Sequence, residues 1–128
     1  GVDLQTELDP GVPHVRCAPE QIERVLANLL ANALRYTPAG GAISVRTEAG
    51  AREVRVLVED GGSGLSPSAQ ARMFERFWRE DRARSSRANS GLGLAIAKGL
   101  VEAHGGTIWA ENRAEGGARV AFTLPLPA

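Results

Sequence analysis

The sequence predicts an α/β fold of two layers, in which a mixed, mostly antiparallel sheet of about five strands carries three helices on one face. Two segments, residues 22–34 and 92–103, repeat apolar side chains at the spacing of a helix that buries one face. Residues 53–59 place every second side chain, a valine, on one side, as a half-buried strand does. Glycine-rich turns separate the remaining strand-like segments, so the strands are expected to pair as hairpins.

Length and composition indicate one globular domain that spans residues 1–128. The 128 residues are enough for one domain with a core and too few for two, and 43% of them are hydrophobic. Basic and acidic residues number 15 each, so the net charge gives no reason to expect a nucleic-acid partner. The single cysteine, Cys17, excludes an internal disulfide and fits a reducing compartment.

Neither a membrane span nor a leader is evident in the sequence. No apolar run reaches the length needed to cross a bilayer, and no signal peptide opens the chain. The chain begins with Gly1 and has its only methionine at Met73. We therefore expect it to be an excised piece of a larger protein that does not itself contact a membrane.

The first third of the chain predicts strands and a long helix. Residues 2–8 alternate in the manner of a strand, and residues 14–17 are expected to form a second, short one. Pro19 suits the first position of a helix, where its missing N–H costs nothing. The apolar stripe then runs to Leu34, and we expect the helix to end near residues 36–38.

A hairpin and a short helix are predicted in the middle of the chain. Residues 42–48 and 53–59 are expected to pair across a short turn. The second strand leads into residues 59–64, a turn with three glycines. Ser66 is then expected to cap a short helix that reaches about Phe77.

The last part of the chain predicts a loop, a helix and a second hairpin. Residues 79–90 are polar and rich in Arg and Ser, which indicates a mobile loop. A helix is expected from Gly91 to residues 104–106, where glycines suit its C-terminus. Residues 107–112 and 118–124 are expected to form the closing hairpin.

The turn into the helix that starts at Gly91 is the first candidate for a binding site. Gly91 and Gly93 lie where the first helical turn begins. A helix start has unpaired N–H groups and a positive dipole end, and glycines let an anion approach both. This stretch is therefore interpreted as a phosphate-binding turn.

Two asparagines on the long helix form a second candidate. Asn28 and Asn32 are four residues apart and share a face, with Arg35 and Tyr36 nearly on the same side. Asparagine is a mediocre helix former, so the pair needs a reason beyond helix stability. Amide carbonyls can bind Mg²⁺, which takes few protein ligands beside phosphates and water. A merely polar helix edge is the alternative.

The glycine turn after the central strand is the third candidate. Asp60 lies at the strand end, where a tight turn can point its carboxylate into a cleft. A carboxylate accepts a hydrogen bond from the exocyclic amine of adenine and repels the carbonyl oxygen of guanine. A plain β-turn is the alternative. Neither glycine cluster completes a dinucleotide fingerprint, and no P-loop occurs anywhere in the sequence.

Aromatic residues precede the mobile loop. Phe74 is expected to belong to the core, as most closely spaced aromatics do. Phe77, Trp78 and Arg79 border the loop, where they could act as its hinge and bring a cation to a phosphate tail.

Together these segments resemble the catalytic, ATP-binding domain of two-component sensor histidine kinases. That domain has the Bergerat fold, which gyrase, the Hsp90 chaperones and the MutL repair proteins share. Residues 28–37 (NLLANALRYT) resemble the N box and residues 60–65 (DGGSGL) the G1 box. Residues 74–79 (FERFWR) resemble the F box and residues 91–96 (GLGLAI) the G2 box. All four occur in the order that the family has.

The resemblance implies a role for each matched position. Asn32, and with it Asn28, would hold Mg²⁺ on the phosphates of ATP, and Asp60 would read the adenine amine. Asn28 and Arg79 are the candidate catalytic residues, with Arg79 placed at the γ-phosphate; Arg82, Arg84 and Arg87 are lesser candidates for that place. The nucleotide-binding residues implied in this way are Asn28, Asn32, Arg35, Tyr36, Asp60, Gly62, Gly64, Leu65, Gly91, Leu92, Gly93, Leu94 and Thr123.

Two positions depart from the family pattern. The family often has Gly-Asp before the long helix, where this chain has Cys17 and Ala18, which puts the cap of that helix in question. The residue after Asp60 is Gly61 in place of the usual Asn, which should loosen the turn slightly.

The resemblance also implies a reaction in which the γ-phosphate passes from Mg–ATP to a histidine on a separate dimerisation domain, and from there to a response regulator. Relatives that hydrolyse ATP have Glu where this chain has Asn28, and an amide is a poor general base, so hydrolysis should be slow. His14 and His104 both fit structural roles better than the acceptor site. We therefore expect the isolated chain to bind ATP without phosphorylating itself.

Three alternatives remain open on the sequence. The first is an anti-sigma-factor serine kinase, and the second is an ATPase of the gyrase type; both share the fold. The third is a degenerate domain that serves only for docking, although no adenine-site Asp or motif glycine is lost here. By the habit of the family, the chain would be a cytoplasmic domain of a parent protein anchored in the cell membrane.

Overall fold

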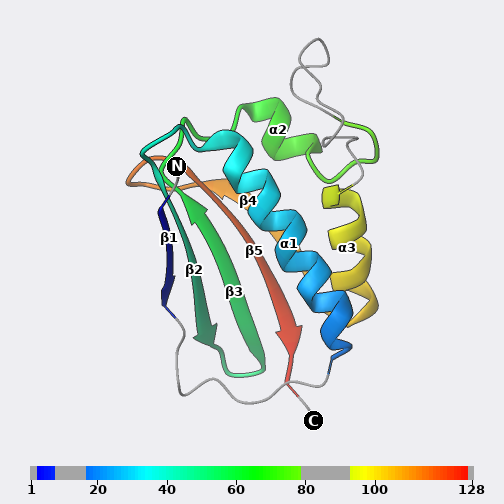
Figure 1. The fold of residues 1–128 in the computed structure, drawn as a ribbon. Coiled ribbons are helices and arrows are strands. Elements are labelled where there is room, and N and C mark those ends of the chain that lie inside the picture. Colours follow the sequence, from blue (N-terminus) through cyan, green and yellow to red (C-terminus); the bar gives the residue numbers. More distant parts are fainter. Residues whose placement is uncertain (1–2, 8–16, 79–92, 127–128) are drawn as a thin grey trace.

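The computed structural model describes residues 3–7, 17–78 and 93–126, which form one five-stranded sheet with helices on one face (Figure 1). The strand order across the sheet is β1-β2-β3-β5-β4. The strands are β1 (Asp3–Glu7), β2 (Ala42–Ala49), β3 (Glu53–Asp60), β4 (Ile108–Asn112) and β5 (Ala118–Pro125). The helices are α1 (Pro19–Tyr36), α2 (Pro67–Arg72) and α3 (Gly93–Ala103).

The sheet is mixed and mostly antiparallel, as predicted. The edge strand β1 runs parallel to β2, and every other neighbouring pair is antiparallel. Both predicted hairpins are present, and the strands extend only one residue beyond the predicted ends at Ala49, Asp60 and Pro125. The fold class is therefore confirmed.

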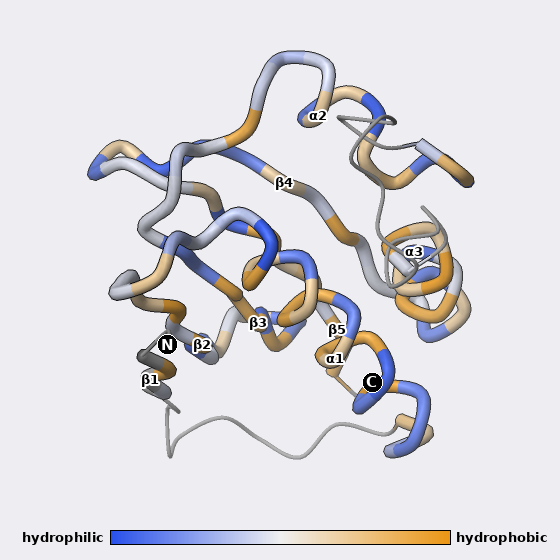
Figure 2. The backbone as a smooth tube through the Cα atoms, turned by 45° about the horizontal axis from the view of Figure 1, so that its top comes forward, coloured by the Kyte–Doolittle hydropathy of each residue, from blue (hydrophilic) through white to orange (hydrophobic). Residues whose placement is uncertain are grey.

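Helices α1 and α3 lie side by side on one face of the sheet and bury a shared core (Figure 1). Val25 and Leu29 of α1 and Val101 of α3 are fully buried, and they belong to one cluster with Phe122 of β5. In Figure 2, the windings of both helices alternate between hydrophobic and hydrophilic residues, as amphipathic helices require. None of the described helices is long and apolar enough to cross a membrane.

Helix α1 begins at Pro19, as predicted, but its N-cap residue cannot cap it. Ala18 has no side-chain hydrogen bond to the helix. Its backbone N–H donates instead to Nε2 of His104, at 3.1 Å, and Nδ1 of the same ring lies 2.9 Å from the carbonyl oxygen of Leu100. Because Nε2 accepts, Nδ1 carries the proton and donates. His104 thus ties the start of α1 to the end of α3, a structural role.

Helix α2 is shorter than the sequence predicted. Ser66 caps it as expected, since its hydroxyl accepts from the N–H of Ala69 at 3.0 Å. The helix ends at Arg72, however, and does not reach Phe77. Phe77 has a φ of 65°, which is incompatible with an α-helix, so the chain has left the helix before the aromatic segment. Ala69 and Met73 still reach the core.

Some predictions lie outside the described residues. These are the mobile loop at 79–90, most of the short strand at 14–17, and the part of the glycine turn before Gly93. Cys17, the last residue of that predicted strand, is in no strand and is exposed.

Candidate nucleotide-binding site

Helix α1 contacts two other segments that the sequence singled out. Its end lies against the turn that follows Asp60 of β3, and its middle lies against Gly93, the first residue of α3. Figure 1 shows α1 beside α3 on the same face of the sheet. Each of these three elements carries one of the polar or glycine-rich segments that the sequence singled out.

Asn28 lies against the first residue of α3. A Cβ added to Gly93 would lie 3.3 Å from Oδ1 of Asn28, so the helix start approaches this amide closely. The amide nitrogen Nδ2 of Asn28 is buried and has no hydrogen-bond partner in the described structure. A buried donor without a partner carries a desolvation cost of about 1–3 kcal/mol, which an anion at the helix start would relieve.

Asn32 is buried one turn further along α1, with 4% of its surface exposed. Its Oδ1 accepts a hydrogen bond from Nη2 of Arg35 at 3.0 Å. The Arg35 guanidinium in turn lies 5.8 Å from the centre of the Tyr36 ring. The shared face that the spacing predicted therefore brings an amide oxygen and a cation into contact.

The Asp60 turn lies against the end of α1. A Cβ at Gly62 would overlap the carbonyl oxygen of Tyr36, so only glycine fits where the turn meets the helix. Asp60 is buried, with 4% of the residue's surface exposed. Its Oδ1 accepts from the N–H of Gly62 at 2.9 Å and from the N–H of Ala118 at 3.4 Å. The turn thus links β3, α1 and the start of β5.

One residue at this site was missed from the sequence. Asn112, the last residue of β4, makes two hydrogen bonds with the backbone of Leu65. Nothing in the local pattern marked it, since an asparagine before a turn is common. The pairing of β4 with β5 sets Asn112 opposite Ala118, and Ala118 in turn contacts Asp60. Only this pairing brings Asn112 to the turn.

Thr123 was predicted to line the base pocket, and the structure shows that this is wrong. In the sheet, Thr123 lies opposite Arg55, five positions before Asp60 along β3, whereas Ala118 at the other end of β5 contacts Asp60. The Thr123 hydroxyl accepts from the N–H of Thr107 at 3.0 Å. The threonine therefore fastens the start of β4 and lies at the opposite end of β5 from the Asp60 turn.

Part of the predicted site is outside the described residues. Arg79, Gly91 and Leu92 fall there, as do the lesser arginine candidates. Of the predicted phosphate turn, only Gly93 and Leu94 are described, and the Leu94 side chain belongs to the core.

The chain belongs to the family described as histidine kinase-, DNA gyrase B- and HSP90-like ATPase, whose model matches residues 17–128. Domains of this family bind ATP. The matched region runs from before α1 to beyond β5 and contains every contact described for the candidate site.

Sensor histidine kinases are among the similar curated proteins. The chain is 39% identical to the sensor histidine kinase WalK of Bacillus subtilis (strain 168) over 126 residues, which are 96% of this chain and 19% of WalK. It is 44% identical to the sensor histidine kinase CusS of Escherichia coli O157:H7 over 128 residues, 99% of this chain and 26% of CusS. The chain therefore spans about a fifth to a quarter of the length of these relatives.

Solved structures of histidine kinases have the same fold. Full-length ShkA in complex with AMPPNP matches with a TM-score of 0.84 and 29% identity, over 100% of this chain and 26% of ShkA. Histidine kinase ThkA in complex with the response regulator protein TrrA matches with a TM-score of 0.79 and 29% identity, over 98% of this chain and 34% of that chain.

Proposed function

We propose that this chain is the ATP-binding catalytic domain of a sensor histidine kinase, which binds Mg–ATP and transfers the γ-phosphate to a histidine on a separate dimerisation domain. Family membership and the similar histidine kinases support the proposal. The single observation that carries it is that α1, which bears Asn28 and Asn32, contacts both glycine segments: Gly93 lies against Asn28, and Gly62 of the Asp60 turn lies against the carbonyl oxygen of Tyr36.

The base end of the site would be read by Asp60. Both hydrogen bonds from Gly62 and Ala118 go to Oδ1, and none goes to Oδ2 within the described part of the chain. Oδ2 is therefore the acceptor left for the exocyclic amine of adenine. The same oxygen would repel the carbonyl group that guanine carries at that position.

The phosphate end would lie at α1 and the start of α3. The carbonyl oxygens of Asn32 and Asn28 suit Mg²⁺, and no cluster of three His, Cys, Asp or Glu residues competes for a metal among the described residues. Bound there, the metal would neutralise charge that develops on the phosphates. Arg35 donates to Oδ1 of Asn32, whose second lone pair stays available to the metal, and its guanidinium lies beside the position proposed for the phosphates.

The side chains of the described residues favour transfer of the phosphate over hydrolysis and leave the acceptor to another domain. Asn28 is an amide and cannot remove a proton from water. His104 is already engaged on both ring nitrogens, which leaves it unsuited as an acceptor. The phosphate would go to a histidine of the dimerisation domain and then to a response regulator, the kind of protein with which ThkA forms its complex.

Calorimetric titration with ATP, with and without Mg²⁺, tests the proposal. We expect binding that Mg²⁺ strengthens, and no stable label on the chain alone after incubation with γ-labelled ATP. Label should appear when the dimerisation segment of the parent protein is added. Stable label on the isolated chain, or rapid release of labelled phosphate, would contradict the proposal and favour a self-modifying kinase or an ATPase.

A further inference from the structure

We propose that Asn112 is a positioning residue for adenine recognition, which holds the turn between Asp60 and Leu65 in its base-reading shape without touching the nucleotide. This inference rests on the function proposed above. Asn112 lies at the end of β4, an edge strand of the sheet, and comes to the turn from 47 residues further along the chain.

The side-chain amide of Asn112 bonds to both backbone groups of Leu65, as a neighbouring strand would. Its Oδ1 accepts from the Leu65 N–H at 2.7 Å, and its Nδ2 donates to the Leu65 carbonyl at 3.1 Å. Leu65 is in neither a helix nor a strand, and its side chain is buried. A side-chain amide that satisfies both backbone groups of one buried residue fixes that residue in position and orientation.

The preceding glycine makes this clamp possible. Gly64 has a φ of +86°, and a Cβ there would lie 2.9 Å from Oδ1 of Asn112. Any other residue would be strained by the backbone and would crowd the amide. Glycine at position 64 therefore has a second reason: besides the thin wall that a flat base would need, it leaves room for the side chain of Asn112.

The other end of the turn is held separately. Nη1 of Arg113 donates to the Asp60 carbonyl at 3.2 Å, and the N–H of Gly61 donates to the carbonyl of Ala42 at 3.2 Å. A Cβ at Gly117 would overlap the same Asp60 carbonyl, so the β4–β5 hairpin lies directly behind the turn. Two consecutive residues of that hairpin therefore fasten the two ends of the loop that carries Asp60.

Asn112 is the cleaner of the two to probe. Arg113 also bonds to Glu115 and lies near Glu59, so removing it would disturb a wider charged cluster. The side-chain hydrogen bonds of Asn112 in the described structure go to Leu65 alone. A turn fixed in advance needs no ordering when the base arrives, and affinity gained in this way is lost when the clamp is removed.

Titration of Asn112→Ala with ATP, ADP and GTP tests the proposal. We expect ATP and ADP to bind about tenfold more weakly, the effect of two lost hydrogen bonds, with the preference for ATP over GTP reduced. The factor by which Mg²⁺ strengthens ATP binding should not change, because the phosphate end is intact. Gln70→Ala is the matched control: Gln70 contacts the same Leu65 carbonyl at 3.4 Å from α2 and should leave affinity unchanged.

Asn112→Asp is the second variant, in case the alanine variant does not fold. It keeps the acceptor for the Leu65 N–H but sets an oxygen against the Leu65 carbonyl, so it should lose part of the same selectivity. The inference is overturned if a folded Asn112 variant binds ATP and GTP as the unaltered chain does, or if its loss of affinity is confined to the Mg²⁺ dependence. If the unaltered chain binds no ATP, the proposed function itself fails.

Discussion

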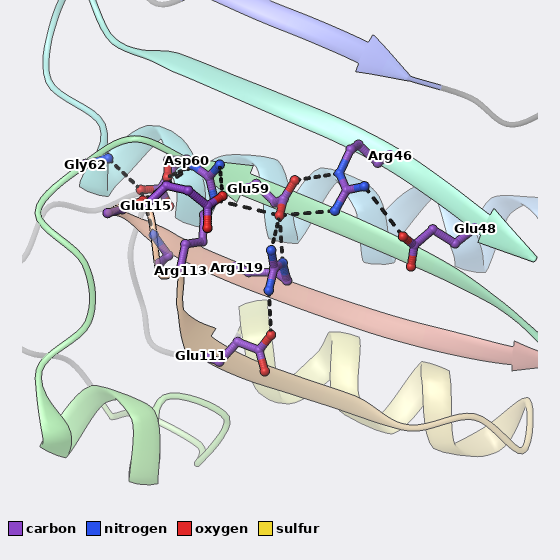
Figure 3. Close-up of polar contacts among 11 residues, drawn as sticks. Arg46, Glu48, Glu59, Asp60, Gly62, Glu111, Arg113, Glu115 and Arg119 are labelled. Atoms are coloured by element: carbon purple, nitrogen blue, oxygen red, sulfur yellow. Dashed lines mark hydrogen bonds and ion pairs between the residues drawn. The ribbon is translucent and has the colours of Figure 1, made fainter. Parts of the chain in front are cut away.

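Two neighbouring acidic residues, Glu59 and Asp60, end the same strand with equally buried side chains and opposite surroundings. Glu59 is 5% exposed and Asp60 is 4% exposed. Because successive residues of a strand face opposite sides, Asp60 points to the helices, as Val58 does, and Glu59 points to the face that none of the described helices covers. Figure 3 shows Glu59 between Arg46 of β2 and Arg119 of β5, with Asp60 beside Gly62.

Glu59 is compensated by cations. Nε of Arg46 lies 2.7 Å from Oε1 of Glu59, and Nε and Nη2 of Arg119 lie 2.7 Å and 2.6 Å from Oε2. Arg46 also pairs with Glu48 of β2, and Arg119 pairs with Glu111 of β4 (Figure 3). The charged cluster therefore joins four strands, β2, β3, β5 and β4. Burial raises the pKa of the Glu59 carboxyl, but the hydrogen bonds from the two arginines outweigh it and the pKa is lowered.

Asp60 has no such compensation. Among the described residues, no cation pairs with its carboxylate, and only backbone N–H groups donate to it, both at Oδ1. Burying a carboxylate while one of its oxygens has no hydrogen-bond donor lowers the stability of the fold, and a ligand that supplies such a donor would recover that free energy. The comparison teaches that burial and residue type alone do not distinguish a structural carboxylate from a candidate binding residue. The distinguishing feature is whether the protein itself already supplies the charged partners of the carboxylate.

Replacing Asp60 by Asn should have the largest effect on binding. Asn can keep an acceptor for the Gly62 N–H, but then it turns an NH₂ group toward the adenine amine. We expect ATP affinity to fall about a hundredfold, because a site built to receive a hydrogen-bond donor then presents one. Calorimetric titration measures the affinity, and urea unfolding should show a stability change of about 1 kcal/mol or less. Unchanged ATP affinity would show that Asp60 does not read the base.

Replacing Glu59 by Gln should produce the converse result. The change leaves two arginines without their carboxylate, and we expect the free energy of unfolding at neutral pH to fall by roughly 2–3 kcal/mol. ATP affinity should stay within about twofold of the unaltered chain, since the side chain faces away from the site. A large loss of affinity in a folded Glu59→Gln protein would contradict the division between the two faces.

The contribution of Glu59 should depend on pH in a defined direction. Its folded pKa is lowered from an ordinary value of 4.5, so the stability that it contributes is fully present above that pH. It is lost as the pH falls below 4.5 and through the folded pKa. Unfolding curves of the unaltered chain and Glu59→Gln should therefore converge on acidification. A difference that persists at the lowest pH would assign the stability to packing alone.

Local patterns predicted the elements well because each depends on nearby residues. The spacing of apolar residues and Pro19 defined α1 from its first residue, and the alternation of valines defined β3 to within one residue of its end. The resemblance to histidine kinases placed Asn28, Asp60 and Gly93 in one site. In the structure Gly93 lies against Asn28 and the Asp60 turn lies against the end of α1, while the shared site and the roles of these residues toward a nucleotide stay predictions.

Strand register was the part that the sequence could not supply. Thr123 and Ala118 both lie in β5, and only the pairing with β3 shows that Ala118 reaches Asp60. Asn112 was missed for the same reason, because its partner Leu65 is brought near by the fold. The positive φ of Phe77 excludes a helix through that residue, and residue preferences do not predict such a φ for an aromatic.

Removing Arg46 alone should have the smallest effect. Arg119 would still hold the Glu59 carboxylate through two of its nitrogens, so the charge would remain compensated. We expect Arg46→Ala to lower the free energy of unfolding by about 1 kcal/mol, less than Glu59→Gln does, with ATP affinity unchanged. Urea unfolding and calorimetric titration measure the two quantities. A loss as large as that of Glu59→Gln would mean that the two arginines act as one unit, and the cluster would then stabilise the sheet cooperatively across β2, β3 and β5.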